Sequence, residues 1–133
     1  MQSHKCRILL VDDHAPIREA VRSLLSAYED LQIVGEAADG QEAINVVEAC
    51  QPDVILMDIN MPRMNGIEAT NLIKKSWDNT VIIGLCAVRE SYTIDAFMRA
   101  GASAIVSKER LDDLHFTIQQ ACQGKAAMRS IGT

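Results

Sequence analysis

The chain has 133 residues, of which 48% are hydrophobic and 23% charged, and this composition is typical of one globular domain with its own core. A formal net charge of −5 provides no basic surface for nucleic acid or anionic lipid, so this domain alone is not expected to bind DNA or a membrane. The apolar runs are too short to span a membrane, and "MQSHKCRILLVDD" lacks the apolar stretch of a secretion signal, which favours a cytoplasmic protein.

Five short apolar runs alternate with helical patterns along the chain. The runs lie at residues 6–11, 31–34, 54–57, 81–85 and 104–106, and most are continuous, as in strands covered on both faces. Apolar residues with the i, i+3, i+4 spacing of helices occur at 17–28, 43–50 and 111–122, with less regular cases at 67–77 and 91–100. Five strand–helix repeats predict an α/β fold, a doubly wound parallel sheet with helices on both faces.

Particular residues mark the ends of these elements. Pro16 suits the first turn of the first helix, Asp39-Gly40 a helix start, and Ala100-Gly101 a helix end. The last residues, "GKAAMRSIGT", are mostly small or polar. We therefore expect one domain at residues 1–123, and a tail or the start of a linker to a domain outside this chain at residues 124–133.

The four cysteines, Cys6, Cys50, Cys86 and Cys122, lie far apart and form no C-x-x-C pair. This spacing indicates neither a zinc site nor a dense disulfide framework. At least three of them are expected to be small hydrophobic side chains in a reducing compartment.

Chemically distinctive residues fall where the predicted strands end. In an open α/β sheet, ligands bind outside the carboxyl ends of the strands. Strand one is followed by Asp12-Asp13, strand three by Asp58, strand four by Cys86-Ala87 and strand five by Lys108. Each acid alone could cap a helix or turn, and the lysine could be solvated, but together at one edge they predict a functional site.

Three carboxylates at one edge would repel one another, and Lys108 offsets only one charge. A divalent cation is therefore expected beside Asp12, Asp13 and Asp58. An all-oxygen site suits Mg²⁺, and Mn²⁺ or Ca²⁺ could substitute for it.

These residues belong to motifs that resemble the receiver domain of two-component response regulators. The resemblance covers residues 6 to about 123 and implies a flavodoxin-like strand order, 2-1-3-4-5. The "DDH" opening is similar to the subgroup with a helix-turn-helix output domain. The matching motifs are "ILLVDD" (8–13), "DVILMDINMPRMNG" (53–66), "VIIGLCA" (81–87) and "GASAIVSK" (101–108).

The resemblance implies that Asp58 accepts a phosphoryl group from the phosphohistidine of a sensor histidine kinase or phosphotransfer protein. The domain would then be a signalling switch, and an enzyme only in catalysing its own phosphorylation and dephosphorylation. Phosphoryl transfer depends mainly on positioning and charge neutralisation, which suits such a site. The phosphoryl oxygens would contact Lys108 and the N–H of Ala87.

The resemblance also implies the metal ligands and the turn around them. Asp13 and Asp58 would contact Mg²⁺ directly, Asp12 through water, and Asn60 through its backbone carbonyl. Met61-Pro62 and Gly66 would shape the turn after Asp58.

Three positions depart from the family pattern. Cys86 replaces the usual switch Ser or Thr with a weaker hydrogen-bond donor, Ile105 replaces a switch Tyr or Phe, and Glu109 replaces the proline after Lys108. We expect a working phosphoacceptor with altered coupling to its partners. The alternative is a phosphorylation-independent interaction module of the same fold, and a redox role for Cys86 is a further alternative.

Other functions fit the sequence less well. A haloacid-dehalogenase-type phosphatase needs Asp-x-Asp after strand one, and a flavodoxin needs a Ser/Thr/Gly-rich phosphate loop where "DDHAPIR" stands. Charged residues near the predicted fourth and fifth helices could pair across a homodimer, although a solvated surface would look the same. These residues are Arg99, Glu109, Arg110, Asp112 and Asp113.

Overall fold

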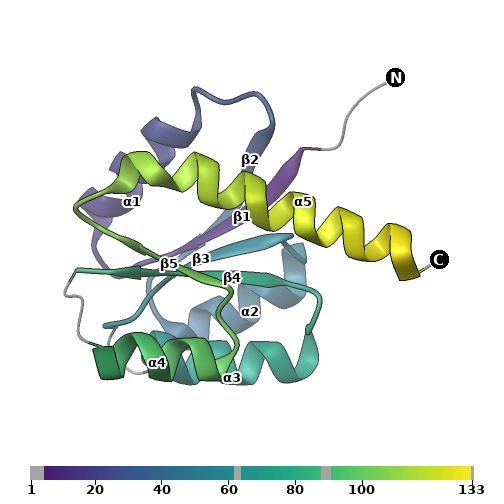
Figure 1. Cartoon of the computed structure of the whole chain (residues 1–133). Coiled ribbons are helices and arrows are strands. Elements are labelled where there is room, and N and C mark those ends of the chain that lie inside the picture. Colours follow the sequence, from purple (N-terminus) through teal and green to yellow (C-terminus); the bar gives the residue numbers. More distant parts are fainter. Residues whose placement is uncertain (1–4, 62–63, 88–90, 133) are drawn as a thin grey trace.

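The computed structural model describes residues 5–61, 64–87 and 91–132. Its strands are β1 (Cys6–Val11), β2 (Leu31–Ala37), β3 (Val54–Asp58), β4 (Val81–Cys86) and β5 (Ala104–Ser107). Its helices are α1 (Ala15–Leu25), α2 (Gly40–Cys50), α3 (Gly66–Ser76), α4 (Ser91–Ala100) and α5 (Leu114–Gly132), with a 3₁₀ turn at Leu111–Asp113. The strands are parallel and lie in the order β2-β1-β3-β4-β5 (Figure 1), so the predicted doubly wound α/β sheet and its strand order are confirmed.

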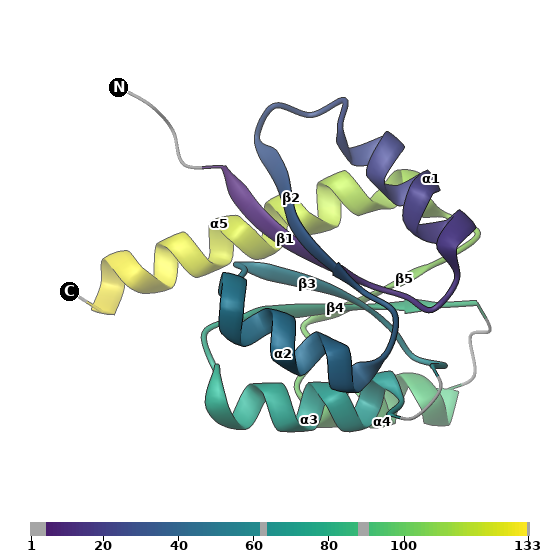
Figure 2. The same cartoon turned by 180° about the vertical axis from the view of Figure 1, so that it is seen from behind.

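Helices cover both faces of the sheet, α1 and α5 on one and α2, α3 and α4 on the other (Figures 1 and 2). The interior strand β1 contributes to both cores: Leu9 and Val11 pack on the side of α2 to α4, and Ile8 and Leu10 on the side of α1 and α5. All four side chains are fully buried. This two-sided burial explains why the strand reads as a continuous apolar run.

The caps and turns predicted from single residues are present. Pro16 lies in the first turn of α1, and the carboxylate of Asp39 caps α2 by accepting the N–H of Glu42 at 2.8 Å. Gly101, directly after α4, has φ 124°, a left-handed conformation that glycine adopts without strain.

Some element boundaries differ from the sequence prediction. Strand β2 continues past the apolar run to Ala37 and includes Gly35 and Glu36. These residues need not be apolar because β2 is an edge strand and they stay half-exposed. Its pairing with β1 shifts register opposite Val34. Helix α1 ends at Leu25, so Tyr28 lies beyond it and stacks on the ring of His115 in α5.

Helix α5 begins at Leu114, after the 3₁₀ turn, and its backbone continues to Gly132. The segment expected as a tail or linker is thus helical through residue 132, in keeping with the good helix formers in "KAAMR". No helix in the described part of the chain, α5 included, combines the length and apolar character needed to cross a membrane.

The expectation that at least three cysteines are unpaired is wrong. Cys6 and Cys122 form a disulfide with an S–S distance of 2.14 Å and a Cα–Cα distance of 6.7 Å, whereas Cys50 and Cys86 are not disulfide-bonded. The two bonded residues are 116 positions apart. Only the packing of α5 against the start of β1 brings them together, and a spacing rule along the chain does not detect it.

Candidate functional site

The residues singled out at the strand ends meet at the carboxyl edge of the sheet. Asp12 follows β1, Asp58 is the last residue of β3, and Lys108 follows β5. Lys108 Nζ lies 2.9 Å from Asp12 Oδ2 and 3.1 Å from Asp58 Oδ1. One ammonium therefore bridges two carboxylates that are 46 residues apart in sequence and come from neighbouring strands.

These charges are largely withdrawn from solvent. Asp12 is fully buried, Asp58 is 4% exposed, and the Lys108 side chain is 16% exposed. Buried charges are stable only when they are paired or hydrogen-bonded. The stability of the site therefore depends on the ion pairs and hydrogen bonds that these three side chains make.

Asp12 is fixed through several of its polar groups. Its N–H donates to Ala37 O at 3.0 Å, and its Oδ1 accepts the N–H of His14 at 2.8 Å. His14 itself stands at the N-cap of α1 without a side-chain capping bond, so Asp12 orders the turn before α1 but is not the cap residue.

Asp13 is exposed and lies beside the buried pair. One carboxylate oxygen each from Asp12, Asp13 and Asp58 lie within 4.8 Å of one another. The structure thus brings together the three acids that the sequence predicts as a metal site.

The turn after Asp58 is built by close backbone approach. The N–H of Asn60 donates to Asp58 Oδ1 at 3.3 Å, and the N–H of Gly66 donates to Ile59 O at 2.8 Å. A Cβ on Gly66 would lie 2.1 Å from Asp58 O, so only glycine fits there. Of the other two residues expected to shape this turn, Met61 packs against the core on the side of α2 to α4, and Pro62 lies outside the described residues.

The electrostatics of the site are unfavourable without further positive charge. Burial, together with the neighbouring Asp12 charge, raises the pKa of Asp58 from 3.8 to about 6, although Lys108 and the Asn60 N–H act in the opposite direction. Burial alone would lower the pKa of Lys108, but its contacts with Asp12 and Asp58 outweigh burial, and that pKa is raised. Lys108 therefore stays charged, and the acids still carry excess negative charge.

The donor set fits a hard divalent cation. All three clustered side chains offer carboxylate oxygens, the ligands that Mg²⁺ prefers. Oδ2 of Asp12 is buried, and the partner described for it is the Lys108 ammonium at 2.9 Å. An acidic cluster with excess charge and a buried oxygen of this kind is suited to bind such a cation.

The predicted switch residues lie on β4 and β5, the strands that carry the rest of this sheet edge. Cys86 ends β4 and is 3% exposed, and its carbonyl accepts the N–H of Lys108 at 2.9 Å. Ala87 follows it and is exposed. Ile105, on β5, is partly buried against the core formed with α2 to α4.

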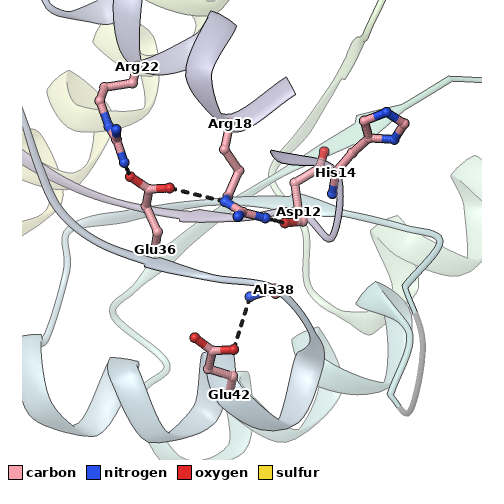
Figure 3. Close-up of polar contacts among 7 residues, drawn as sticks. All are labelled: Asp12, His14, Arg18, Arg22, Glu36, Ala38 and Glu42. Carbon is pink, nitrogen blue, oxygen red and sulfur yellow. Dashed lines mark hydrogen bonds and ion pairs between the residues drawn. The ribbon is translucent and has the colours of Figure 1, made fainter. Parts of the chain in front are cut away.

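One group of residues contacts the site without a clear signal in the sequence. Arg18 of α1 donates from Nη1 to Asp12 O at 2.5 Å and from Nε to Glu36 Oε1 at 3.1 Å (Figure 3). Arg22, one turn further along α1, pairs with the same Glu36. A strand-end acid in β2 is the only sequence signal for this network, because an arginine on an amphipathic helix usually faces solvent.

Comparisons with known proteins agree with this geometry. The transcriptional regulatory protein YxjL of Bacillus subtilis (strain 168), itself described as uncharacterised, is 38% identical over 133 residues, 98% of this chain and 61% of that protein. The transcriptional regulatory protein DegU of Brevibacillus brevis is 38% identical over 128 residues, 95% of this chain and 54% of that protein. This chain thus spans less than two thirds of either regulator.

A solved structure agrees as well. The LuxR-family two-component response regulator from Aurantimonas sp. SI85-9A1 has a TM-score of 0.86 and 33% identity, with 90% of this chain and 86% of that chain covered. The family described as "Response regulator receiver domain" matches residues 8–119. These residues include Asp12, Asp58 and Lys108. The chain belongs to the response regulator receiver domain family.

Proposed function

We propose that Asp58 is the phosphoacceptor of this receiver domain, and that its donor is a phosphohistidine on a sensor histidine kinase or phosphotransfer protein. One observation carries the proposal: the Asp58 carboxylate lies at the sheet edge, clustered with two further acids and 3.1 Å from the Lys108 ammonium. This arrangement places a nucleophilic carboxylate next to a cation that can neutralise an incoming phosphoryl group.

The transfer forms an O–P bond at Asp58 and breaks the N–P bond of the donor, whose imidazole leaves with the electron pair. Lys108 and the N–H of Asn60 both contact Oδ1 of Asp58, which leaves Oδ2 as the attacking oxygen. The carboxylate must be ionised to attack, and with a pKa of about 6 it is largely ionised at neutral pH. Lys108 and the N–H of Ala87 then hold two phosphoryl oxygens.

Asp13, Asp58 and the carbonyl of Asn60 would hold Mg²⁺ directly, and Asp12 would act through water. When bound, the ion neutralises the crowded carboxylates and the phosphoryl oxygens. Mn²⁺ or Ca²⁺ would occupy the same oxygen ligands. The fit of the acidic cluster to a hard cation supports this assignment.

Phosphorylation is proposed to change how the domain binds partners or a second copy of itself, with Cys86 and Ile105 altering the coupling. A homodimer in which the charged residues near α4 and α5 pair across the contact is part of this proposal. Arg110 and Asp113, two residues considered for that contact, already pair within the chain at 3.3 Å. Apart from its own phosphorylation and dephosphorylation, no catalysis is proposed.

Control of transcription is the proposed output, because the two regulators named above are transcriptional regulatory proteins longer than this chain. In this proposal residues 1–123 are the receiver and residues 124–133 lead to an output domain, through which alone DNA would be bound. A cytoplasmic location is proposed with it, where the Cys6–Cys122 disulfide would be uncommon.

The test is intact-mass measurement after incubation with acetyl phosphate and Mg²⁺. We expect the wild-type chain to gain one phosphoryl group, and Asp58→Asn to gain none. Asp53→Asn, directly before the other end of β3, is the matched control and should be labelled like the wild type. A wild-type chain that takes no label would refute the proposal and favour the phosphorylation-independent interaction module.

A further inference from the structure

Arg18 connects the acidic site to the edge of the sheet. Its guanidinium donates to the carbonyl of Asp12 at 2.5 Å and to Glu36 Oε1 at 3.1 Å (Figure 3). The Arg18 and Glu36 side chains are only 22% and 23% exposed, so the contact is partly shielded from water. A planar guanidinium can make both bonds at once because its N–H groups are fixed relative to one another.

The carbonyl that Arg18 holds belongs to the peptide between Asp12 and Asp13. The N–H of Asp12 is already fixed by Ala37 O, and its carboxylate by the N–H of His14. With the Arg18 contact, the peptide that precedes Asp13 is fixed as well. The direction in which Asp13 projects toward Asp58 therefore depends on Arg18.

Glu36 orients the guanidinium in turn. It pairs with both Arg18 and Arg22, two residues one turn apart on α1. Arg22 is 55% exposed and donates to Glu36, but no described contact joins it to Asp12. The two arginines therefore share helix, charge and partner, and differ in whether they reach the acidic turn.

We infer that Arg18 is a positioning residue for the magnesium site: anchored by Glu36, it holds the Asp12-Asp13 peptide so that both carboxylates face Asp58. The inference rests on the proposed function, because it concerns the ion that the phosphoacceptor requires. Groups that orient metal ligands without touching the metal commonly change metal affinity by about 10- to 100-fold when they are replaced.

A positioning role and simple electrostatics predict opposite changes in Mg²⁺ affinity when the charge of Arg18 is removed. Arg18 is a cation near a site for another cation, so removing its charge should by electrostatics alone strengthen Mg²⁺ binding. If Arg18 positions the ligands, its replacement should weaken Mg²⁺ binding despite the lost repulsion. The direction of the change therefore separates the two roles.

The test measures the Mg²⁺ dissociation constant by isothermal titration calorimetry on the whole chain, without a phosphodonor. Arg18→Lys keeps the charge but cannot bridge Asp12 O and Glu36 together, and we expect about tenfold weaker binding. Arg18→Gln should also bind more weakly. Arg22→Lys, the matched control, should bind Mg²⁺ like the wild type.

Acetyl phosphate labelling provides a second readout. For Arg18→Lys, the Mg²⁺ concentration at half-maximal rate should rise, while the rate at saturating Mg²⁺ stays close to that of the wild type. Glu36→Gln should shift the half-maximal concentration in the same direction, and the double variant should add little to either single change.

Unchanged or tighter Mg²⁺ binding in both Arg18 variants would overturn the inference, and so would an equal loss in Arg22→Lys. These results would leave the proposed function intact, provided that wild-type Asp58 is labelled. A wild-type chain that neither binds Mg²⁺ nor takes label would instead refute the proposed function itself.

Discussion

Replacing Asp58 with asparagine should stabilise the metal-free domain. The pKa of this carboxyl is raised from 3.8 to about 6, because burial and the Asp12 charge outweigh Lys108. The folded state therefore binds the Asp58 proton more tightly than the unfolded state does. One pKa unit corresponds to about 1.36 kcal/mol. The shift from 3.8 to about 6 therefore means that ionised Asp58 lowers the free energy of unfolding by about 3 kcal/mol at pH 7.5.

The sign of the pH dependence follows from the same shift. The penalty is absent well below pH 3.8, grows between pH 3.8 and 6, and is complete above that range. Asparagine carries no charge at any of these pH values. We therefore expect Asp58→Asn to exceed the wild type in free energy of unfolding by about 3 kcal/mol at pH 7.5, and by only about 1 kcal/mol at pH 4.5.

The assay is urea denaturation followed by far-UV circular dichroism in EDTA at both pH values. Asp95→Asn, an exposed acid on α4, is the control and should change the free energy of unfolding by less than about 0.5 kcal/mol. Adding Mg²⁺ should stabilise the wild type more than Asp58→Asn, because the wild type keeps the full ligand set.

Two results would refute this reasoning. One is a metal-free Asp58→Asn variant that is less stable than the wild type at pH 7.5. The other is a gain of equal size at both pH values, which would mean that the carboxylate charge is not the cause. Either result would show that the aspartates are not crowded as described.

Three further changes test other parts of the structure. Gly66→Ala would place a Cβ 2.1 Å from Asp58 O, so it should lower the free energy of unfolding in urea by about 2 kcal/mol or more and slow acetyl phosphate labelling. Cys122→Ser removes the bond between residues 116 positions apart and should lower the free energy of unfolding by up to about 5 kcal/mol in non-reducing urea titrations. Cys50→Ser, the control, should behave like the wild type. A wild-type chain that is equally stable with and without reductant would contradict the disulfide. Cys86→Thr should leave labelling of Asp58 nearly unchanged but enlarge the phosphorylation-dependent change in hydrogen exchange, and a collapse of labelling would assign Cys86 to the transfer itself.

The sheet and the strand-end residues could be predicted because burial and parallel pairing act locally on the sequence. A strand covered on both faces needs a continuous apolar run, as in β1, and parallel strands bring their carboxyl ends to one edge. Asp12, Asp58 and Lys108 were therefore expected together, and the structure places them within ion-pair distance.

The features that sequence analysis missed depend on packing between distant elements. The C-terminal half of β2 contains Gly35 and Glu36, and its sequence is similar to that of a loop, because an edge strand needs fewer apolar residues. The sequence alone predicts that Arg18 is a solvated helix residue. Its contacts with Glu36 and Asp12 exist only because α1 packs beside β2. The partner of Cys6 likewise depends on where α5 crosses the sheet.

The bond between Cys6 and Cys122 closes the chain into a covalent ring that contains all five strands. The part of α5 beyond Cys122 projects outside this ring, as its C-terminal end does in Figure 1. Tension applied between that end and the N-terminus would pass through the sulfur bridge and bypass the strand pairs, which would not be peeled apart. With the disulfide reduced, the same tension would act directly on β1 and the sheet. The oxidation state of Cys6 and Cys122 therefore determines which bonds bear a force applied to the ends of the domain.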